Sequence, residues 1–444
     1  MIALISLLSI VILLLVFFKF EWGVGLFVLY CLMVPTFGLN FGASFVIGRN
    51  MFSLFLLIYL MVWANKKGGI KRRAISLMSP FFMLFIVQFF LIVFHLDKMP
   101  LIEQLDNFRL DIFGLFLPFT IIGVAYVSEN KGEVFNIILY VAILISSSYT
   151  LFLITRLGQN PYIDAITPLL NDYNMMNQDR ILEEGIRRFG YISSVYPYVT
   201  EYGDFLIFST VFLLYRIGRD QTLIPKLLLG LVTICVLVCG SRSVLLGYAV
   251  VIFLYLLSHR HFYVLAIAIL LFGISAILIV HFFPEYVLYV QSINDDTITG
   301  GSSIDMRLSQ LGGCFDAINN NPLFGNGYGW AGWYRTNVGR HPVMLSFESI
   351  LIQVLCDNGI VGVILYTVVT IFIINGVRKS FPKSVEIRHS VVLLLLGFYS
   401  YAFFTGDYGM MKVMMWFYAI LIANALQERD SLLNQKMDDL RISQ

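Results

Sequence analysis

Residues 226–257 read KLLLGLVTICVLVC followed by GSRSVLLGYAVVIFLYLL, so two apolar runs meet at a short break made of Gly240, Ser241 and Arg242. Runs of roughly 17 to 25 apolar residues cross the hydrocarbon core of a bilayer as helices, and runs of about this kind recur along the chain. The 444 residues are 58% hydrophobic and 13% charged, with a mean hydropathy of +0.80. Water-soluble globular proteins are far less apolar. The sequence therefore predicts an all-α polytopic membrane protein.

About twelve or thirteen transmembrane helices are predicted, and residues 1–426 form a single polytopic membrane domain in this interpretation. The first run lacks the flanking positive charge and the small-residue cleavage site of a signal peptide, so we expect a retained span. The approximate spans are 2–18, 21–39, 45–64, 75–95, 110–127, 134–154, 201–217, 224–239, 243–257, 262–281, 347–374, 391–405 and 410–426.

The positions of lysine and arginine predict the orientation of these spans. Positive residues gather in one alternating set of loops, which indicates the cytoplasmic side: 66–73, 216–226, 260 and 378–388. The tail 427–444 falls on the same side. Thirteen spans would place the first residue outside, and twelve would place it inside.

Two loops on the predicted exterior side are long, at 155–200 and 282–346. Loops of this length in a compact protein are functional or disordered. Both mix aromatic residues with Gly and Pro, unlike the polar composition of disordered segments, so we expect functional loops.

Several function classes are disfavoured by the composition. The five cysteines are an odd number and lie mostly in spans, so no disulfide framework is implied, and the six histidines show no metal-ligand spacing. The chain has no GxxxxGK[ST] sequence, which argues against ATP hydrolysis. We expect no cofactor and no nucleic-acid partner.

Arginine dominates the predicted exterior surface. Arg242 lies there, and the exterior loops contain no lysine between 155 and 346. A guanidinium group matches phosphate oxygens bidentately, which an ammonium group does less specifically. The bias suggests a phosphate-bearing ligand from the outer leaflet. The structural alternative is that Arg242 only snorkels to lipid headgroups. Further arginines in the exterior loops include Arg180, Arg187, Arg188, Arg307, Arg335 and Arg340.

Four motifs in residues 185–365 resemble the Wzy-type O-antigen polymerase and O-antigen ligase superfamily of bacterial membrane glycosyltransferases. GSRSVLLGYAVVI resembles its Ser-Arg element at the start of a span. MRLSQLGGCFDAINNNPLFGNGYG is similar to its Arg followed by a helix and a Pro-Leu-x-Gly-x-Gly turn. ESILIQVLCDNGIVGVILY resembles the segment that opens the next span and ends in Gly-x-x-Gly, and RRFGYISSVYPYVTEYG is similar to a weaker Arg-x-x-Gly element.

The resemblance implies a polymerase of undecaprenyl-pyrophosphate-linked oligosaccharide repeats in the bacterial inner membrane, with the active site facing outward. The growing glycan would pass to the end sugar of a new lipid-linked repeat, and a chain-length regulator protein is a possible partner. Fixed positive groups would stabilise the departing pyrophosphate, a role that fits Arg242, Arg307 and, more weakly, Arg188. These arginines would make a metal dispensable.

The general base is less well defined by the resemblance. Ligases of the family carry a His where this chain has Glu348, which favours a polymerase with Glu348 as the base. His341 is the alternative base, if its loop folds back. Arg340, Tyr328 and Trp330 are further candidates for binding substrate.

Each assignment has a structural alternative. Glu348 precedes a predicted helix and could simply interact with the helix dipole, while Arg307 could pair with Asp305 or Asp316. The aromatic residues near 330 could be interface anchors.

Two other functions stay open. A ligase would transfer finished glycan to another acceptor. A flippase or transporter would show broken helices and polar groups near the bilayer midplane, features that the sequence does not display.

Overall fold

The computed structural model describes residues 2–34, 43–66, 72–95, 99–128, 132–156, 160–166, 192–196, 198–219, 222–259, 304–339, 341, 348–406 and 410–442. Every regular element in these ranges is a helix, which confirms the predicted fold class. The helices are α1 (Ile2–Phe18), α2 (Phe20–Met33), α3 (Ala43–Lys66), α4 (Arg72–Ile92), η1 (Val93–His95), α5 (Leu101–Phe113), α6 (Phe116–Val127), α7 (Glu133–Thr155), α8 (Pro161–Ile166), α10 (Val199–Ile217), α11 (Ile224–Val238), α12 (Arg242–Ser258), α16 (Ile304–Ile318), α17 (Trp330–Asn337), α18 (Ile350–Ser380), α19 (Val385–Thr405) and α20 (Met411–Ile442).

The helices follow the predicted spans closely. Each span except 262–281, which lies outside the described residues, falls on a helix. Five helical segments are long and apolar enough to cross a membrane: Ala74–Ile92, Leu101–Val127, Glu133–Thr155, Ile350–Ser380 and Val385–Thr405. Shorter apolar helices include α11 and α12. The predicted span 110–127 covers the end of α5 and all of α6, which a turn at Gly114 and Leu115 separates.

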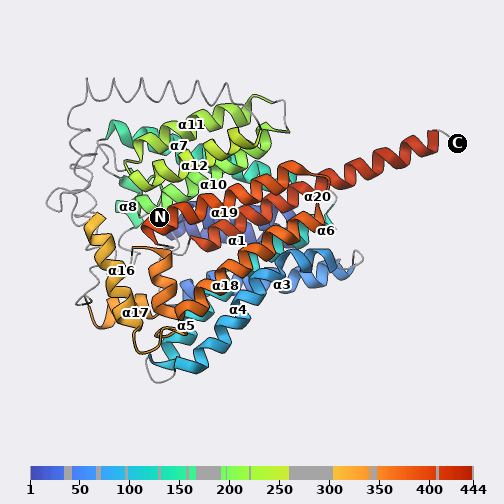
Figure 1. Ribbon diagram of the computed structural model, residues 1–444. Coiled ribbons are helices and arrows are strands. Elements are labelled where there is room, and N and C mark those ends of the chain that lie inside the picture. Colours follow the sequence, from blue (N-terminus) through green and yellow to red (C-terminus); the bar gives the residue numbers. More distant parts are fainter. Residues whose placement is uncertain are drawn as a thin grey trace.

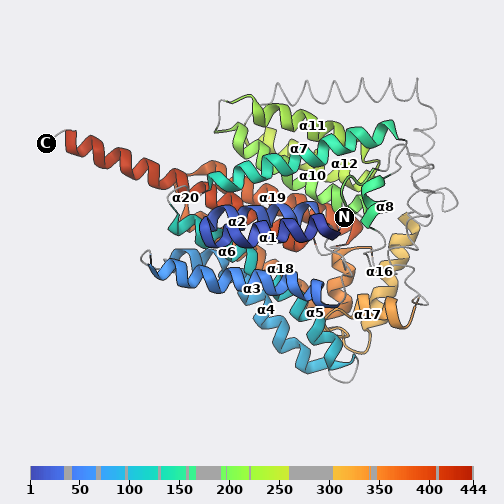
Figure 2. The ribbon, with the colours of Figure 1, turned by 180° about the vertical axis from the view of Figure 1, so that it is seen from behind.

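The helices form one bundle (Figure 1). The N-terminus lies at the end of the bundle that carries α8 and α16, which we call the α16 end, and α20 projects from the opposite end in both views (Figures 1 and 2).

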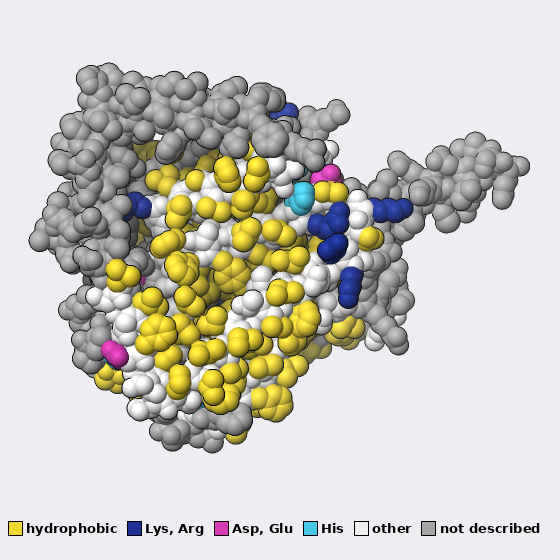
Figure 3. Space-filling view, viewed as in Figure 1, with side chains coloured by type: hydrophobic (Ala, Val, Ile, Leu, Met, Phe, Trp, Pro, Cys, Tyr) yellow, Lys and Arg dark blue, Asp and Glu magenta, His cyan; other side chains and the backbone are white. Residues whose placement is uncertain are grey.

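The middle of the bundle is formed by α10, α19 and α20. Nearly all of α10 is buried, and it packs against α11, α12, α19 and α20. The outer helices expose large apolar side chains, such as Phe18, Phe90 and Leu227. Apolar side chains make up much of the part of the face in Figure 3 that is not grey. An apolar surface of this extent is that of a protein surrounded by lipid.

Basic side chains gather at the end of the bundle opposite to the α16 end (Figure 3). Three helices end there with basic residues in their last turn: α3 with Lys66, α10 with Arg216, and α18 with Arg378 and Lys379. The Arg216 side chain donates hydrogen bonds to Tyr140 Oη at 3.1 Å and to Asn424 Oδ1 at 3.1 Å. Basic residues therefore mark one end of the bundle, as the loop pattern predicted.

Candidate functional site

A break in α18 is the structural centre of the candidate site. Gly359 has φ 60° and ψ −156°, which interrupts the helix within Ile350–Ser380. Backbone groups released by the break bind the loop 321–329. Asn326 N and Gly327 N donate to the carbonyl oxygens of residues 356 and 357 at 2.8 and 2.9 Å, and the N–H groups of residues 360 and 361 donate to those of residues 322 and 323 at 3.0 Å. The loop thus satisfies backbone groups that a broken helix in a membrane cannot leave unpaired.

Glycine is required on both sides of this contact. Gly325 has φ 75°, and a Cβ there would lie 2.7 Å from Gly359 N. A Cβ on Gly359 would lie 2.5 Å from the carbonyl oxygen of Leu323. Gly327 and Gly329 also have positive φ, a conformation that glycine adopts without the steric cost of a Cβ. The loop motif and the Gly-x-x-Gly segment are therefore two halves of one packed unit.

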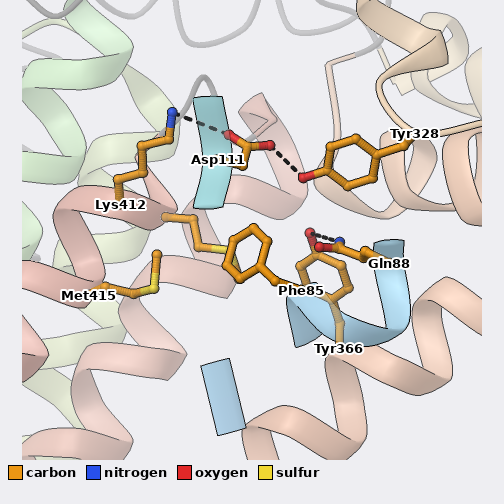
Figure 4. A pocket seen from close by; sticks show the side chains of 8 residues that line it. Phe85, Gln88, Asp111, Tyr328, Tyr366, Lys412 and Met415 are labelled. Carbon is orange, nitrogen blue, oxygen red and sulfur yellow. Dashed lines mark hydrogen bonds and ion pairs between the residues drawn. The ribbon is translucent and has the colours of Figure 1, made fainter. Parts of the chain in front are cut away.

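A cavity of about 480 Å³ lies beside this unit, between α4, α5, α17, α18 and the start of α20. Its described lining is polar and aromatic, and a smaller recess of about 30 Å³ shares several of its residues (Figure 4). The volume is within the range of about 300–1,000 Å³ that holds small organic ligands. The lining residues used below are Gln88, Asp111, Tyr328, Trp333, Asn358 and Lys412.

Asp111 joins the two walls of the cavity. Its Oδ2 accepts a hydrogen bond from Tyr328 Oη at 2.5 Å, and its Oδ1 lies 3.2 Å from Lys412 Nζ (Figure 4). Burial raises the pKa of the Tyr328 hydroxyl well above 10.0, and the charge of Asp111 raises it further. Tyr328 is therefore a permanent hydrogen-bond donor at neutral pH.

Two further side chains fix the position of the loop over the cavity. Gln104 is fully buried; its Oε1 accepts from Tyr328 N at 3.2 Å, and its Nε2 donates to the carbonyl oxygens of His95 and Met99. Asp357 Oδ1 accepts from Ala331 N at 2.7 Å. Because Ala331 lies in the first turn of α17, Asp357 pairs one of the backbone N–H groups that a helix leaves without a partner at its start.

Arg242 is the first residue of α12 and lies near the start of α10, at the α16 end of the bundle and opposite to Arg216. The preceding Gly240 has φ 68°, and the hydroxyl groups of Ser241 and Ser243 lie 3.0 Å apart. The start of α12 packs closely on α10, since a Cβ on Gly203 would lie 2.2 Å from Val244 Cγ2. Arg242 is half-buried, so it is held against the bundle.

Glu348 and His341 also lie at this end. Glu348 is half-buried, directly before Ser349, the N-cap of α18. His341 is half-buried, with its ring centroid 5.2 Å from that of Tyr334 and 6.4 Å from that of Trp330. Burial lowers the pKa of the His341 imidazole below 6.5, and the Asp316 carboxylate opposes this shift. Neither residue is among those that line the cavity.

Of the remaining candidate residues, some lie in the loop 321–329 or in α17, and others are wholly or partly undescribed. Tyr328 lines the cavity, whereas Trp330 is buried in a small apolar cluster with Met99, Cys314 and Cys356. Arg188 and Arg340 lie outside the described residues, and Arg307 falls in α16 with its side chain undescribed. Within the described residues, no three His, Cys, Asp or Glu side chains group as metal ligands would.

Most residues that line the cavity were not predicted from the sequence. Asp111 and Lys412 lie at the predicted exterior ends of the spans 110–127 and 410–426, where an ionisable residue is a functional signal. That signal was available. Gln88 and Asn358 gave none, because single carboxamides inside apolar runs are not distinctive.

The comparison with known families agrees with this arrangement. Residues 227–367 match the family model described as O-Antigen ligase, a segment that includes α12, α16, the loop 321–329 and the break in α18. No match is found among curated proteins. The family match supports the resemblance of residues 227–367 to the O-antigen polymerase and ligase superfamily. Together with the long apolar helices, it indicates a multi-pass membrane protein with a glycosyltransferase-like role in glycan assembly.

Proposed function

We propose that the chain is a polymerase that joins undecaprenyl-pyrophosphate-linked oligosaccharide repeats into a surface polysaccharide. The family match carries this proposal, since the matched residues 227–367 include Arg242, Arg307 and Glu348. Glu348, in the place where ligases of the family have His, favours polymerase over ligase.

The reaction faces outward from the bacterial inner membrane in this proposal. Basic residues end α3, α10 and α18 at the opposite end of the bundle, and such residues favour the cytoplasmic side. The α16 end, with Arg242 and Glu348, then faces the exterior.

The chemistry is a single displacement at the anomeric carbon of the donor glycan. The acceptor hydroxyl oxygen forms the new bond to this carbon, the bond to the pyrophosphate oxygen breaks, and the hydroxyl proton passes to Glu348 or, alternatively, His341. Negative charge develops on the leaving pyrophosphate. Arg242 stands at the N-terminus of α12, and a helix N-terminus and a guanidinium group both favour phosphate oxygens. Arg242, with Arg307 and Arg188, would stabilise this negative charge without a metal.

Deletion of the gene in the host tests the proposal. A polymerase mutant should carry single repeat units on its surface in place of long chains. Long chains that stay attached to undecaprenyl pyrophosphate would instead indicate a ligase. Repeat units trapped on the cytoplasmic face would indicate a flippase.

A further inference from the structure

We propose that the cavity between α4, α5, α17, α18 and α20 binds a saccharide part of the lipid-linked substrate, with Gln88 and Asn358 as its hydrogen-bonding contacts. The proposal rests on the proposed function for the source of the saccharide. The site itself follows from the cavity and its described lining, which does not include Arg242.

Two residues of the lining carry a buried carboxamide oxygen that has no partner among the described residues. Gln88 Oε1 and Asn358 Oδ1 make no hydrogen bond with any described residue, and the two residues are only 1% and 4% exposed. Both line the cavity, and Figure 4 shows Gln88 at the wall of the smaller recess. A buried polar atom without a partner is costly and rare in native proteins. A ligand that supplies hydrogen bonds at these two positions would remove the cost.

Hydroxyl groups suit these positions better than other ligand groups. The oxygen and nitrogen of a carboxamide can exchange places by a flip of the group, and a hydroxyl both donates and accepts. It therefore satisfies Gln88 and Asn358 in either orientation. The Tyr328 hydroxyl and the Asp111 carboxylate add polar contacts within the same cavity.

The charges of the lining disfavour a phosphate group. The lining contains three acidic residues, Glu103, Asp111 and Asp357, and two basic residues, Arg335 and Lys412. Lys412 is already 3.2 Å from Asp111, which leaves little positive potential for an anion. Trp333 contributes an aromatic ring to the lining, a surface that buries apolar area efficiently. The cavity thus fits an uncharged, polyhydroxylated ligand of more than one ring.

The test measures binding to the full-length protein in lipid nanodiscs. The first probe is the free oligosaccharide released by mild acid from the host's lipid-linked repeat, and the second is farnesyl pyrophosphate, which has no sugar. Gln88→Leu removes the hydrogen-bonding group at similar size. It should weaken oligosaccharide binding about tenfold, the effect of one well-made hydrogen bond, and leave farnesyl pyrophosphate binding unchanged.

Thermal unfolding separates binding from folding in this variant. Because Gln88 makes only a long hydrogen bond, 3.5 Å from its Nε2 to Tyr366 Oη, an apolar replacement should hold or raise the unfolding temperature. Asp111→Asn is the second variant, and Asp106→Asn is its matched control. Asp106 lies on the same helix, is exposed, and pairs with Arg109 away from the cavity. Asp111→Asn should weaken oligosaccharide binding, and Asp106→Asn should not.

Two outcomes would overturn the inference. Oligosaccharide binding that is equal in wild type and Gln88→Leu would leave a cavity that holds only water. A loss of farnesyl pyrophosphate binding in Gln88→Leu would assign the cavity to the headgroup. Failure of the proposed function looks different: the oligosaccharide would bind in a manner that depends on Gln88, yet the purified protein would form no polymer.

Discussion

Gly325 and Gly359 are in direct contact, with φ 75° and 60°, and a Cβ on either would lie 2.7 Å from the backbone nitrogen of the other. Through this contact the loop 321–329 packs against the backbone of α18 at the break in that helix. The same loop carries Tyr328 to the cavity. The shape of the cavity therefore depends on the backbone packing of Gly359, next to Asn358 in the lining.

Gly325→Ala should destabilise the protein, because a left-handed backbone costs a non-glycine residue about 1–3 kcal/mol and the new Cβ would meet α18. The unfolding temperature in detergent, followed by tryptophan fluorescence, measures this. Gly376→Ala is the matched control in α18, since a Cβ there meets nothing within 4 Å and alanine favours helix. Equal unfolding temperatures for the two variants would mean that the loop does not pack as described.

Tyr328→Phe should lower stability by about 1.5–3 kcal/mol, the range for a hydrogen bond to a charged group, because Asp111 loses its 2.5 Å donor. Burial raises the pKa of Tyr328 above 10.0 in the folded protein. The unfolded chain therefore releases the tyrosine proton first, and the stabilisation falls as the pH rises above 10. Below pH 10 the difference between wild type and Tyr328→Phe should be constant. A difference that already varied between pH 7 and 9, in chemical denaturation, would contradict the raised pKa.

Arg242→Lys should abolish most polymer formation while the protein still inserts and unfolds normally. The lysine keeps the charge but loses the bidentate geometry that recognises phosphate. Chain length on gels and unfolding temperature are the two readouts. Polymer formation at the wild-type level would indicate that Arg242 only reaches lipid headgroups.

Glu348→Gln should lower turnover by about 100-fold or more if Glu348 accepts the hydroxyl proton, with substrate binding largely kept. A residue that only interacts with the dipole of α18 would cost about 0.3–1 kcal/mol of stability, with almost no effect on rate. His341→Ala is the companion variant. Because burial lowers the pKa of His341 below 6.5, its imidazole is mostly neutral at pH 7 and able to accept a proton. An active Glu348→Gln beside an inactive His341→Ala would assign the base to His341.

The helices could be predicted from the sequence because lipid requires long apolar runs, and α7, α18 and α19 show this pattern directly. The break at Gly359 could not, since a glycine inside an apolar run also fits a continuous helix. It is defined by hydrogen bonds to residues more than thirty positions away. The positive φ values of GNGYG were predictable from glycine spacing alone. The pairing of Asp111 with Lys412 joins the first and last thirds of the chain, and only the folded bundle brings them together.

Reconstitution with defined substrates tests the central claim most directly. The purified protein in liposomes, given lipid-linked repeat units and excess chelator, should convert them into a ladder of longer lipid-linked glycans, because arginine side chains supply the positive charge. Repeat units that remain unchanged, with and without added magnesium or manganese, would contradict polymerase activity. A ladder that forms only after metal is restored would contradict the metal-independent mechanism.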